Sequence, residues 1–190
     1  MPLATRDPAA AVAEVVRLVG LRVPRCGRTT LVAVDGPSGS GKSVLGAALG
    51  DSLEAPVVHM DDIYPGWDGL ADAVPLVTTQ VLEPLAAGRP AAYRRWSWVG
   101  QEWSRQVVPV PETPLLVLEG VGSSVRPAGD YASVCVWVEA ERDARFGRGI
   151  DRDGEAYRPH WERWARQEDA LFAADGTRDR ADVILDTTTL

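Results

Sequence analysis

Gly36-Pro37-Ser38-Gly39-Ser40-Gly41-Lys42-Ser43 is the stretch that decides the fold of this chain. It matches the pattern G-x-x-x-x-G-K-[ST], whose glycines allow successive backbone N–H groups to wrap around phosphates. The apolar run 30–35 leads directly into it, and a helix is expected from Lys42 to about Leu53. A strand, a glycine loop and a helix in this order are the context that supports a phosphate-binding loop.

Lys42 is the single lysine of the chain beside nineteen arginines. Lysine provides a slim point charge, which the broad fork of arginine does not replace in a tight loop. We expect Lys42 to reach the β- and γ-phosphates of a nucleotide and Ser43 to ligate Mg²⁺. The N-terminus of the following helix adds partial positive charge. The expected nucleotide-binding residues are Gly36, Pro37, Ser38, Gly39, Ser40, Gly41, Lys42, Ser43 and Val44.

Composition limits the class of protein. The 190 residues, 45% of them hydrophobic, suffice for a single domain over 1–190. A net charge of −7 argues against a nucleic-acid or anionic-membrane partner. Only Cys26 and Cys135 are present, without metal-ligand spacing, and no apolar run reaches membrane-spanning length. We therefore expect a cytoplasmic protein whose partners are small molecules.

Short apolar runs predict the sheet. They lie at 30–35, 57–60, 115–119, 134–138 and 183–185, separated by segments long enough for crossover helices. A leading helix is expected from Pro8 to Gly20, with Asp7 as its N-cap. Together these patterns predict an α/β, three-layer P-loop NTPase fold, in which a five-stranded parallel sheet carries helices on both faces.

Three further segments complete the expected fold. Residues 71–87 read as helical, with Pro75 and Pro84 limiting the continuous part to about the middle. Residues 93–110, rich in tryptophan, predict a β-hairpin inserted at about 91–110 beside the phosphate site. Two helices are expected at 143–153 and 161–174.

Two acids follow predicted strands, at the sheet edge where open α/β sheets bind ligands. Glu119 ends an apolar strand and is expected to hold Mg²⁺, directly or through water. Asp61 lies in His59-Met60-Asp61-Asp62 after the second core strand and is a candidate general base for an attacking hydroxyl. Adjacent acids are also common turn formers. His59 and His160 are interpreted as packing or solubilising residues.

Arg142, Arg145, Arg148 and Arg152 are spaced by three, three and four residues, which places them along one helix face. One interpretation is a lid that brings arginines to a transferring phosphoryl group. The alternative is an ordinary surface on which Asp143, Asp151 and Asp153 form salt bridges.

The order of these motifs resembles the uridine kinase branch of the P-loop small-molecule kinases, with phosphoribulokinase-like enzymes nearby. The resemblance spans about 31–185. Beyond the phosphate loop, it rests on four segments: Asp61-Asp62-Ile63-Tyr64, similar to the family's D-S-F-Y; Glu119-Gly120; Arg145-Phe146-Gly147-Arg148 continuing to Arg152-Asp153, similar to the family's lid; and Ala181-Asp182-Val183-Ile184-Leu185, similar to its last strand.

This resemblance implies ATP as cofactor together with Mg²⁺, and a lid at about 142–156. It implies a catalytic set of Asp61, Lys42, Arg145 and Arg148. The implied substrate-binding set is Asp61, Tyr64, Tyr93, Arg94 and Arg152, and the implied metal ligands are Ser43 and Glu119.

One position departs from the family. Where uridine kinases follow the hairpin tyrosine with an aspartate that holds the ribose hydroxyls, Tyr93 is followed by Arg94 and Arg95. Arginine has donors only and cannot accept those hydrogen bonds. The two arginines could instead meet an acceptor that carries a carboxylate or phosphate, or they could stack on Trp96 or Trp98.

The leading hypothesis is a kinase that moves the γ-phosphoryl group of ATP to a hydroxyl of a small acceptor. A nucleotide-dependent switch or NTPase is the competing class. Its GTPase version is disfavoured because the chain has no asparagine and no second lysine for an N-K-x-D element. A nucleoside monophosphate, a sugar phosphate or a hydroxy acid stays open as acceptor, and so does assembly into a homo-oligomer.

Overall fold

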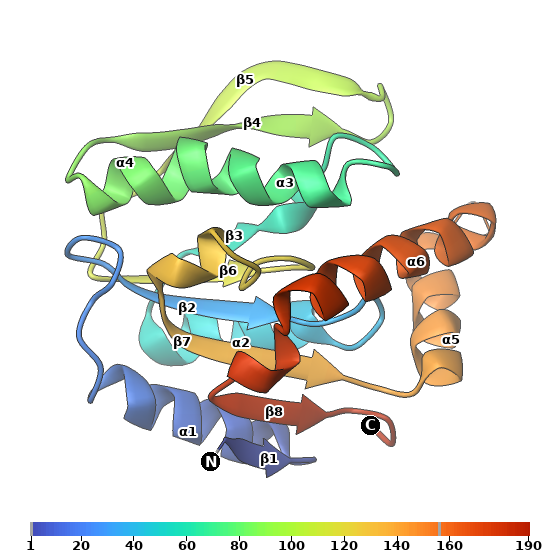
Figure 1. Cartoon of the computed structure of the whole chain (residues 1–190), viewed down its shortest axis with the longest axis horizontal. Coiled ribbons are helices and arrows are strands. Elements are labelled where there is room, and N and C mark those ends of the chain that lie inside the picture. The colour runs from blue at the N-terminus through green and yellow to red at the C-terminus, as the bar shows by residue number, and fades with distance from the viewer. Residues whose placement is uncertain (1, 156) are drawn as a thin grey trace.

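A six-stranded parallel sheet forms the centre of the computed structural model, which describes residues 2–155 and 157–190 (Figure 1). The strand order is β1-β8-β7-β2-β6-β3, and each neighbouring pair is parallel. The strands are β1 Leu3–Thr5, β2 Thr30–Asp35, β3 Val57–His59, β6 Leu115–Glu119, β7 Ala132–Glu139 and β8 Val183–Asp186. The expected three-layer α/β fold is confirmed, but the strand number is six rather than five.

The additional strand is β1, which pairs Leu3 with Val183 at the free edge of β8. Its sequence, Leu-Ala-Thr, is too short to show an alternating pattern, and both Leu3 and Ala4 are exposed. The strand exists because β8 offers unpaired backbone groups at this edge, which only the assembled sheet provides.

Two cores cover the two faces of the sheet, and the alternation of β2 shows the division. Val32 and Val34 pack with α1 (Pro8–Val19) and α2 (Lys42–Leu53) on one face. Leu31 and Ala33 face the other core, beneath α3 (Leu70–Val77) and α6 (Arg158–Asp175). Because both faces are covered, β2 is buried along its whole length, as its continuous apolar sequence predicts.

The helical prediction at 71–87 was too short in its continuous part. Residues 70–86 form one helical run, made of α3, a π-helical turn at Thr78–Leu82 and α4 (Glu83–Ala86). A wider π turn accommodates the disturbance that a proline ring causes one turn upstream. The Thr78 hydroxyl donates to the Val74 carbonyl at 2.7 Å, and the Thr79 hydroxyl donates to the Pro75 carbonyl at 2.9 Å.

Several other predicted elements are confirmed. The side chain of Asp7 caps α1 by accepting from the Ala9 N–H at 2.9 Å. The hairpin consists of β4 (Ala91–Ser97) and β5 (Glu102–Val110), which lie above α3 and α4 in Figure 1. Helix α5 spans Arg142–Asp153 and is followed by α6; Ala156, the last residue of the expected lid, lies outside the described residues.

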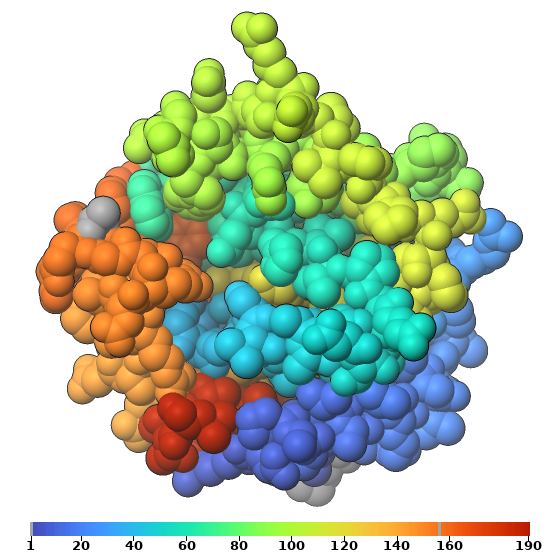
Figure 2. Space-filling view, turned by 180° about the vertical axis from the view of Figure 1, so that it is seen from behind, coloured from blue at the N-terminus to red at the C-terminus, as the bar shows by residue number. Residues whose placement is uncertain are grey.

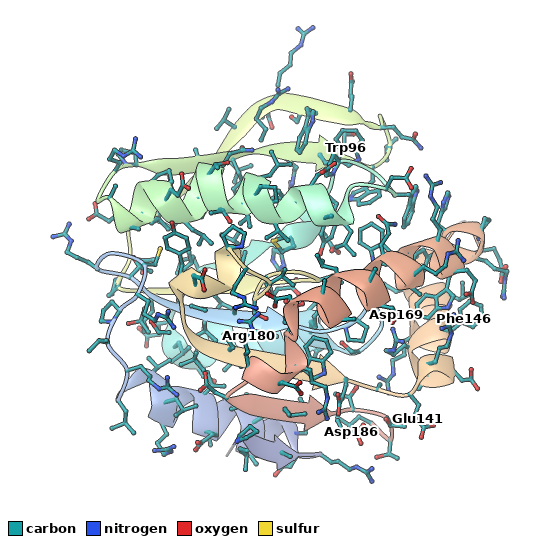
Figure 3. The ribbon with its side chains drawn as sticks, viewed as in Figure 1. Trp96, Glu141, Phe146, Asp169, Arg180 and Asp186 are labelled. Carbon is teal, nitrogen blue, oxygen red and sulfur yellow. The ribbon has the colours of Figure 1, made fainter. Side chains whose placement is uncertain are left out.

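Within the hairpin, Trp96 faces Trp103 across the two strands, with ring centroids 5.2 Å apart (Figure 3). The register shifts between Arg94 and Trp96, so that Arg95 has no direct partner on β5. Such a bulge turns a side chain away from the regular alternation. Among the described residues, no helix is both long and apolar enough to cross a membrane.

Candidate active site

The glycine loop leaves β2 at the carboxyl edge of the sheet and ends at Gly41, where α2 begins. Gly36 and Gly39 have φ of +137° and +76°, and a Cβ at either position would meet a backbone oxygen, that of Val138 at 2.0 Å or that of Arg145 at 2.2 Å. Only glycine permits both the dihedrals and the close approach. The loop is therefore packed tightly against the end of β7 and the start of α5.

Lys42 folds back over the loop, and its Nζ donates to the Pro37 carbonyl at 3.0 Å. The side chain is buried, and burial lowers its pKa, while the nearby carboxylates of Glu168 and Glu119 act in the opposite direction. An anionic phosphate in this loop would provide further compensation for the buried charge.

Glu168 of α6 binds the backbone of the glycine loop, a role that was not predicted from the sequence. Its carboxylate is almost fully buried and accepts from the Ser38 N–H at 2.8 Å. Its other oxygen lies 3.6 Å from the Arg145 guanidinium, which donates to the Ser38 carbonyl at 3.2 Å. Glu168 follows Trp164 and Trp161 by four and seven residues, so its place on the buried face of a helix was readable from spacing.

Asp35, the last residue of β2, is a second missed residue. Its fully buried carboxylate accepts four hydrogen bonds of 2.7–2.9 Å, from the N–H groups of Gly36, Gly122 and Ser124 and from the Ser124 hydroxyl. Burial raises the pKa of Asp35, and the four donors oppose this shift. The bonds tie the start of the glycine loop to the loop after β6.

Ser43 and Glu119 lie together, as expected for metal ligands. The Ser43 hydroxyl is 3.3 Å from both carboxylate oxygens of Glu119. Hard oxygen atoms of this kind, completed by phosphate and water, suit Mg²⁺. His59 joins this group, with its Nδ1 2.6 Å from a Glu119 oxygen, and this contact raises the pKa of His59. The interpretation of His59 as a packing residue overlooked this pair, because β3 and β6 become neighbours only in the folded sheet.

Asp61 lies in the short 3₁₀ turn Met60–Asp62 that follows β3. Asp61 is an exposed residue, but the protein around its carboxylate displaces part of the solvent, and this desolvation, together with the negative charge of Glu119, raises its pKa. The hairpin fixes this turn, since the Trp98 indole donates to the Asp61 carbonyl at 2.9 Å.

The three neighbouring hairpin residues Tyr93, Arg94 and Arg95 contact different parts of the structure. Arg95 forms two hydrogen bonds of 2.7 and 2.8 Å with the carboxylate of Asp62, and the Tyr93 hydroxyl donates to the same carboxylate at 3.1 Å. Arg94 lies along the hairpin itself, with its guanidinium 3.3 Å from the Ser104 carbonyl and 6.0 Å from the Trp103 ring. The structure thus brings Tyr93 to the site through Asp62 and leaves Arg94 outside it.

Three cavities follow one another along the carboxyl edge of the sheet. A cavity of about 220 Å³ is lined by Gly39, Gly41, Lys42, Ser43, Val44, Arg148 and Arg152. An apolar cavity of about 470 Å³ shares Gly41, Val44 and Arg148 with it, and a third of about 420 Å³ shares Arg152. Seen from behind, the molecule is hollowed between the orange segment of α5, the blue start of α2 and the teal loop after β3 (Figure 2).

The two outer cavities have different linings. The apolar cavity is formed by α1, α2, β8 and the chain end that follows β8. Its lining residues include Pro8, Ala9, Val12, Leu45, Ala48, Leu185 and Leu190. The third is lined by Ser38, Asp61, Asp62, Tyr64, Trp67, Trp98, Arg152, Asp153, Tyr157 and Trp164. We name the three the apolar cavity, the phosphate cavity and the acceptor cavity. Tyr64 lines the acceptor cavity with its ring, because its hydroxyl is used in a hydrogen bond to the Val121 carbonyl at 2.9 Å.

The four arginines of α5 do not act as one face. Arg148 and Arg152 line the phosphate cavity, whereas Arg142 pairs with Glu162 at the surface at 2.6 Å. Arg145 is buried beneath the glycine loop and lines none of the three cavities. The helix is held against α6, where Phe146 meets Trp161 with ring centroids 5.3 Å apart (Figure 3).

The fold is that of the P-loop kinases. The structure is similar to a protein described as a possible uridine kinase from Bacillus stearothermophilus, with a TM-score of 0.61 and 20% identity over 91% of this chain and all of the other. It is also similar to one provisionally described as a fructose transport system kinase from Silicibacter sp. TM1040, with a TM-score of 0.60 and 20% identity over 95% of this chain and 99% of the other. The sequence matches no protein-family model and no curated protein.

Proposed function

We propose that this protein is an ATP-dependent kinase that transfers the γ-phosphoryl group to a hydroxyl of a small acceptor. The observation that carries the proposal is the row of three cavities with shared walls, because a phosphoryl transfer needs room for the donor nucleotide and its phosphates, with the acceptor next to the γ-phosphate. Arg148 stands between the first two and Arg152 between the last two. The uridine kinase-like pattern of the sequence and the P-loop kinase fold agree with this order.

In this mechanism the apolar cavity takes the base of ATP, and the phosphates lie along the glycine loop. Backbone N–H groups of the loop and the start of α2 bind the phosphate oxygens. Lys42, Arg148 and Arg152 neutralise charge on the β- and γ-phosphates, which is the main contribution that a protein makes to phosphoryl transfer. Mg²⁺, held by Ser43 and by Glu119 directly or through water, supplies further neutralisation when bound.

Asp61 is the general base of the proposed reaction. It lines the acceptor cavity, and its pKa is raised by desolvation and by Glu119, a rise that the charge of Lys42 partly opposes. A hydroxyl placed there donates its proton to the Asp61 carboxylate as its oxygen attacks the γ-phosphorus. Tyr64 and the Asp62–Arg95 pair hold the walls of the cavity, while Arg145 supports the glycine loop without touching substrate.

The test is ADP release with MgATP in the presence and absence of hydroxyl compounds. We expect slow release alone and faster release with a suitable acceptor, with ³¹P NMR showing a phosphorylated product. Lys42→Ala should abolish both binding and turnover. Brisk ATP hydrolysis that no acceptor accelerates would favour the alternative NTPase function and contradict the proposed one.

A further inference from the structure

The acceptor cavity has an unusual balance of charge. Three carboxylates line it, those of Asp61, Asp62 and Asp153, against the single guanidinium of Arg152. That guanidinium is already engaged, because it donates to Asp153 at 2.9 and 2.7 Å. Among the described residues, no other lysine, arginine or histidine lines this cavity.

The arginine that could have met an anionic acceptor is neutralised as well. Arg95 forms its two hydrogen bonds with Asp62, and Tyr93 adds a third bond to the same carboxylate. Arg94 lies outside the cavity on the hairpin. With both arginine pairs balanced, Asp61 is the carboxylate of this cavity that forms no salt bridge among the described residues, and the charges of Lys42 and Arg152 act on it only at longer range.

The rest of the wall is aromatic. Trp67 is its centre: its ring stacks on His160 with centroids 4.3 Å apart and lies 4.8 Å from Trp98, 5.4 Å from Tyr157 and 6.0 Å from Trp164. Gln167 fixes this segment by donating to the Trp67 carbonyl at 2.8 Å. Aromatic rings offer area for an apolar body and attract cations, whereas their negative faces repel anions.

We propose that the acceptor is a hydroxylated organic cation, an amine or quaternary ammonium compound with an apolar body that fits a cavity of about 420 Å³. This inference rests on the proposed kinase function. The acceptor's hydroxyl oxygen forms the new bond to the γ-phosphorus, and its proton passes to Asp61. The bond from the γ-phosphorus to the bridging oxygen breaks, and its electron pair leaves with ADP.

A cationic acceptor also suits the chemistry of Asp61. Desolvation by the surrounding protein and the charge of Glu119 together raise the pKa of this carboxylate and so favour its protonated form. A positive charge bound nearby favours the ionised form, which is the one that can take a proton from the hydroxyl. The negative phosphates of ATP would also attract a cationic acceptor.

The experiment measures binding with matched sets of hydroxyl compounds. One set is glucosamine, glucose and glucose 6-phosphate; the other is phenylalaninol, 3-phenylpropane-1,2-diol and 3-phenyllactate. Each is titrated into the protein saturated with a non-hydrolysable ATP analogue and Mg²⁺, and fluorescence follows the cavity tryptophans Trp67, Trp98 and Trp164. We expect at least one cation to bind about tenfold more tightly than its neutral partner. Equal or tighter binding of the neutral or anionic members, or no binding of either cation at millimolar concentration, would overturn the inference.

A charge-changing variant tests the same point independently. Asp62→Asn leaves Arg95 without its carboxylate partner at the cavity wall. The ratio of the Kd of the neutral compound to that of the cationic one should fall by about tenfold. Glu102→Gln removes one negative charge from an exposed position of the same hairpin and should leave the preference unchanged. Equal effects of the two variants would mean that the cavity wall does not set the preference.

Failure of this inference can be separated from failure of the kinase proposal. Tight binding and phosphorylation of neutral compounds, with turnover lost in Lys42→Ala, would leave a kinase whose acceptor is uncharged. Failure of MgATP to stabilise the protein would instead count against the kinase itself.

Discussion

Lys42 and Asp61 contribute opposite charges to the junction between the phosphate and acceptor cavities. Lys42 is buried and Asp61 is partly desolvated by the protein around it, so that the pKa of the lysine is lowered and the pKa of the aspartate is raised. Perturbed groups of opposite sign that meet in a cleft are typical of catalytic sites. Their proposed roles can be tested separately, because one binds phosphate and the other takes a proton.

Asp61→Asn should reduce phosphoryl transfer by on the order of 10²- to 10⁴-fold, because asparagine cannot accept the proton of the hydroxyl. ATP binding, measured by calorimetry, should change little, since Asp61 lines the acceptor cavity rather than the phosphate cavity. Near-normal transfer by this variant would mean that another group is the base.

The raised pKa of Asp61 also predicts the pH dependence of kcat/KM. The base works only when ionised, so activity should fall as the pH drops through the pKa of Asp61. Because that pKa is raised in the free protein, the midpoint should lie above the ordinary aspartate value of about 3.9. A midpoint at or below the ordinary value would contradict the desolvation of this carboxylate or its role as the base.

Asp35→Asn should destabilise the protein by about 2 kcal/mol in urea unfolding. The asparagine amide keeps one accepting oxygen and turns its NH₂ group toward N–H donors that now lack a partner. Asp7→Asn is the matched control, because asparagine caps a helix as well as aspartate does. Equal stability of the two variants would show that the Asp35 network contributes little.

At the level of elements, α6 connects the glycine loop with the acceptor cavity. Glu168 holds the Ser38 N–H, while Trp164, one turn earlier, lines the acceptor cavity and meets Tyr64 with ring centroids 5.0 Å apart. The helix lies in front of the sheet and reaches α5 at its first turns (Figure 1). One rigid element therefore sets the distance between the donor and acceptor sides.

Glu168→Gln should cost about 3 kcal/mol of folding free energy, because it leaves the buried Arg145 guanidinium without a counter-charge. Glu162→Gln provides the control, because Glu162 also lies on α6 and pairs with an arginine of α5, Arg142, but at the surface. This substitution should cost under about 1 kcal/mol of folding free energy. Urea unfolding of both variants measures the difference. Similar losses of unfolding free energy in the two variants would show that burial does not make the Arg145–Glu168 pair more important for stability than the surface pair.

At the level of the whole molecule, the three cavities draw on α1, α2, α5, α6 and the hairpin, so a bound nucleotide and acceptor would together contact elements from both faces of the sheet. A ligand that binds only the folded protein stabilises all of these elements together. This coupling makes thermal unfolding a direct measure of nucleotide binding.

MgATP at about 100 times its Kd should stabilise the protein by about 2.7 kcal/mol, which raises Tm by about 5–10 °C for a domain of this size. Lys42→Ala should lose this increase while keeping its own Tm without nucleotide near that of the unmodified protein. An increase of equal size in Lys42→Ala would mean that ATP binds elsewhere than the glycine loop.

The sequence by itself determined the glycine loop, the central strands, the hairpin and the two acids at the strand ends. These features depend on local spacing, apolar periodicity and glycine dihedrals, which the order of residues carries directly. The edge strand β1 and the continuous helical run at 70–86 could not be read in this way, because one depends on a free sheet edge and the other on a π turn that absorbs the prolines.

Only the tertiary structure decided which charges remain available at the site. It paired Arg95 with Asp62, turned Arg94 outward and placed Arg145 on Glu168, although all three arginines look alike in the sequence. Partners that lie 33 or 23 residues away become neighbours only through the fold. Long-range pairing cancels the charges that local sequence displays, and for this reason the proposed character of the acceptor rests on the tertiary structure.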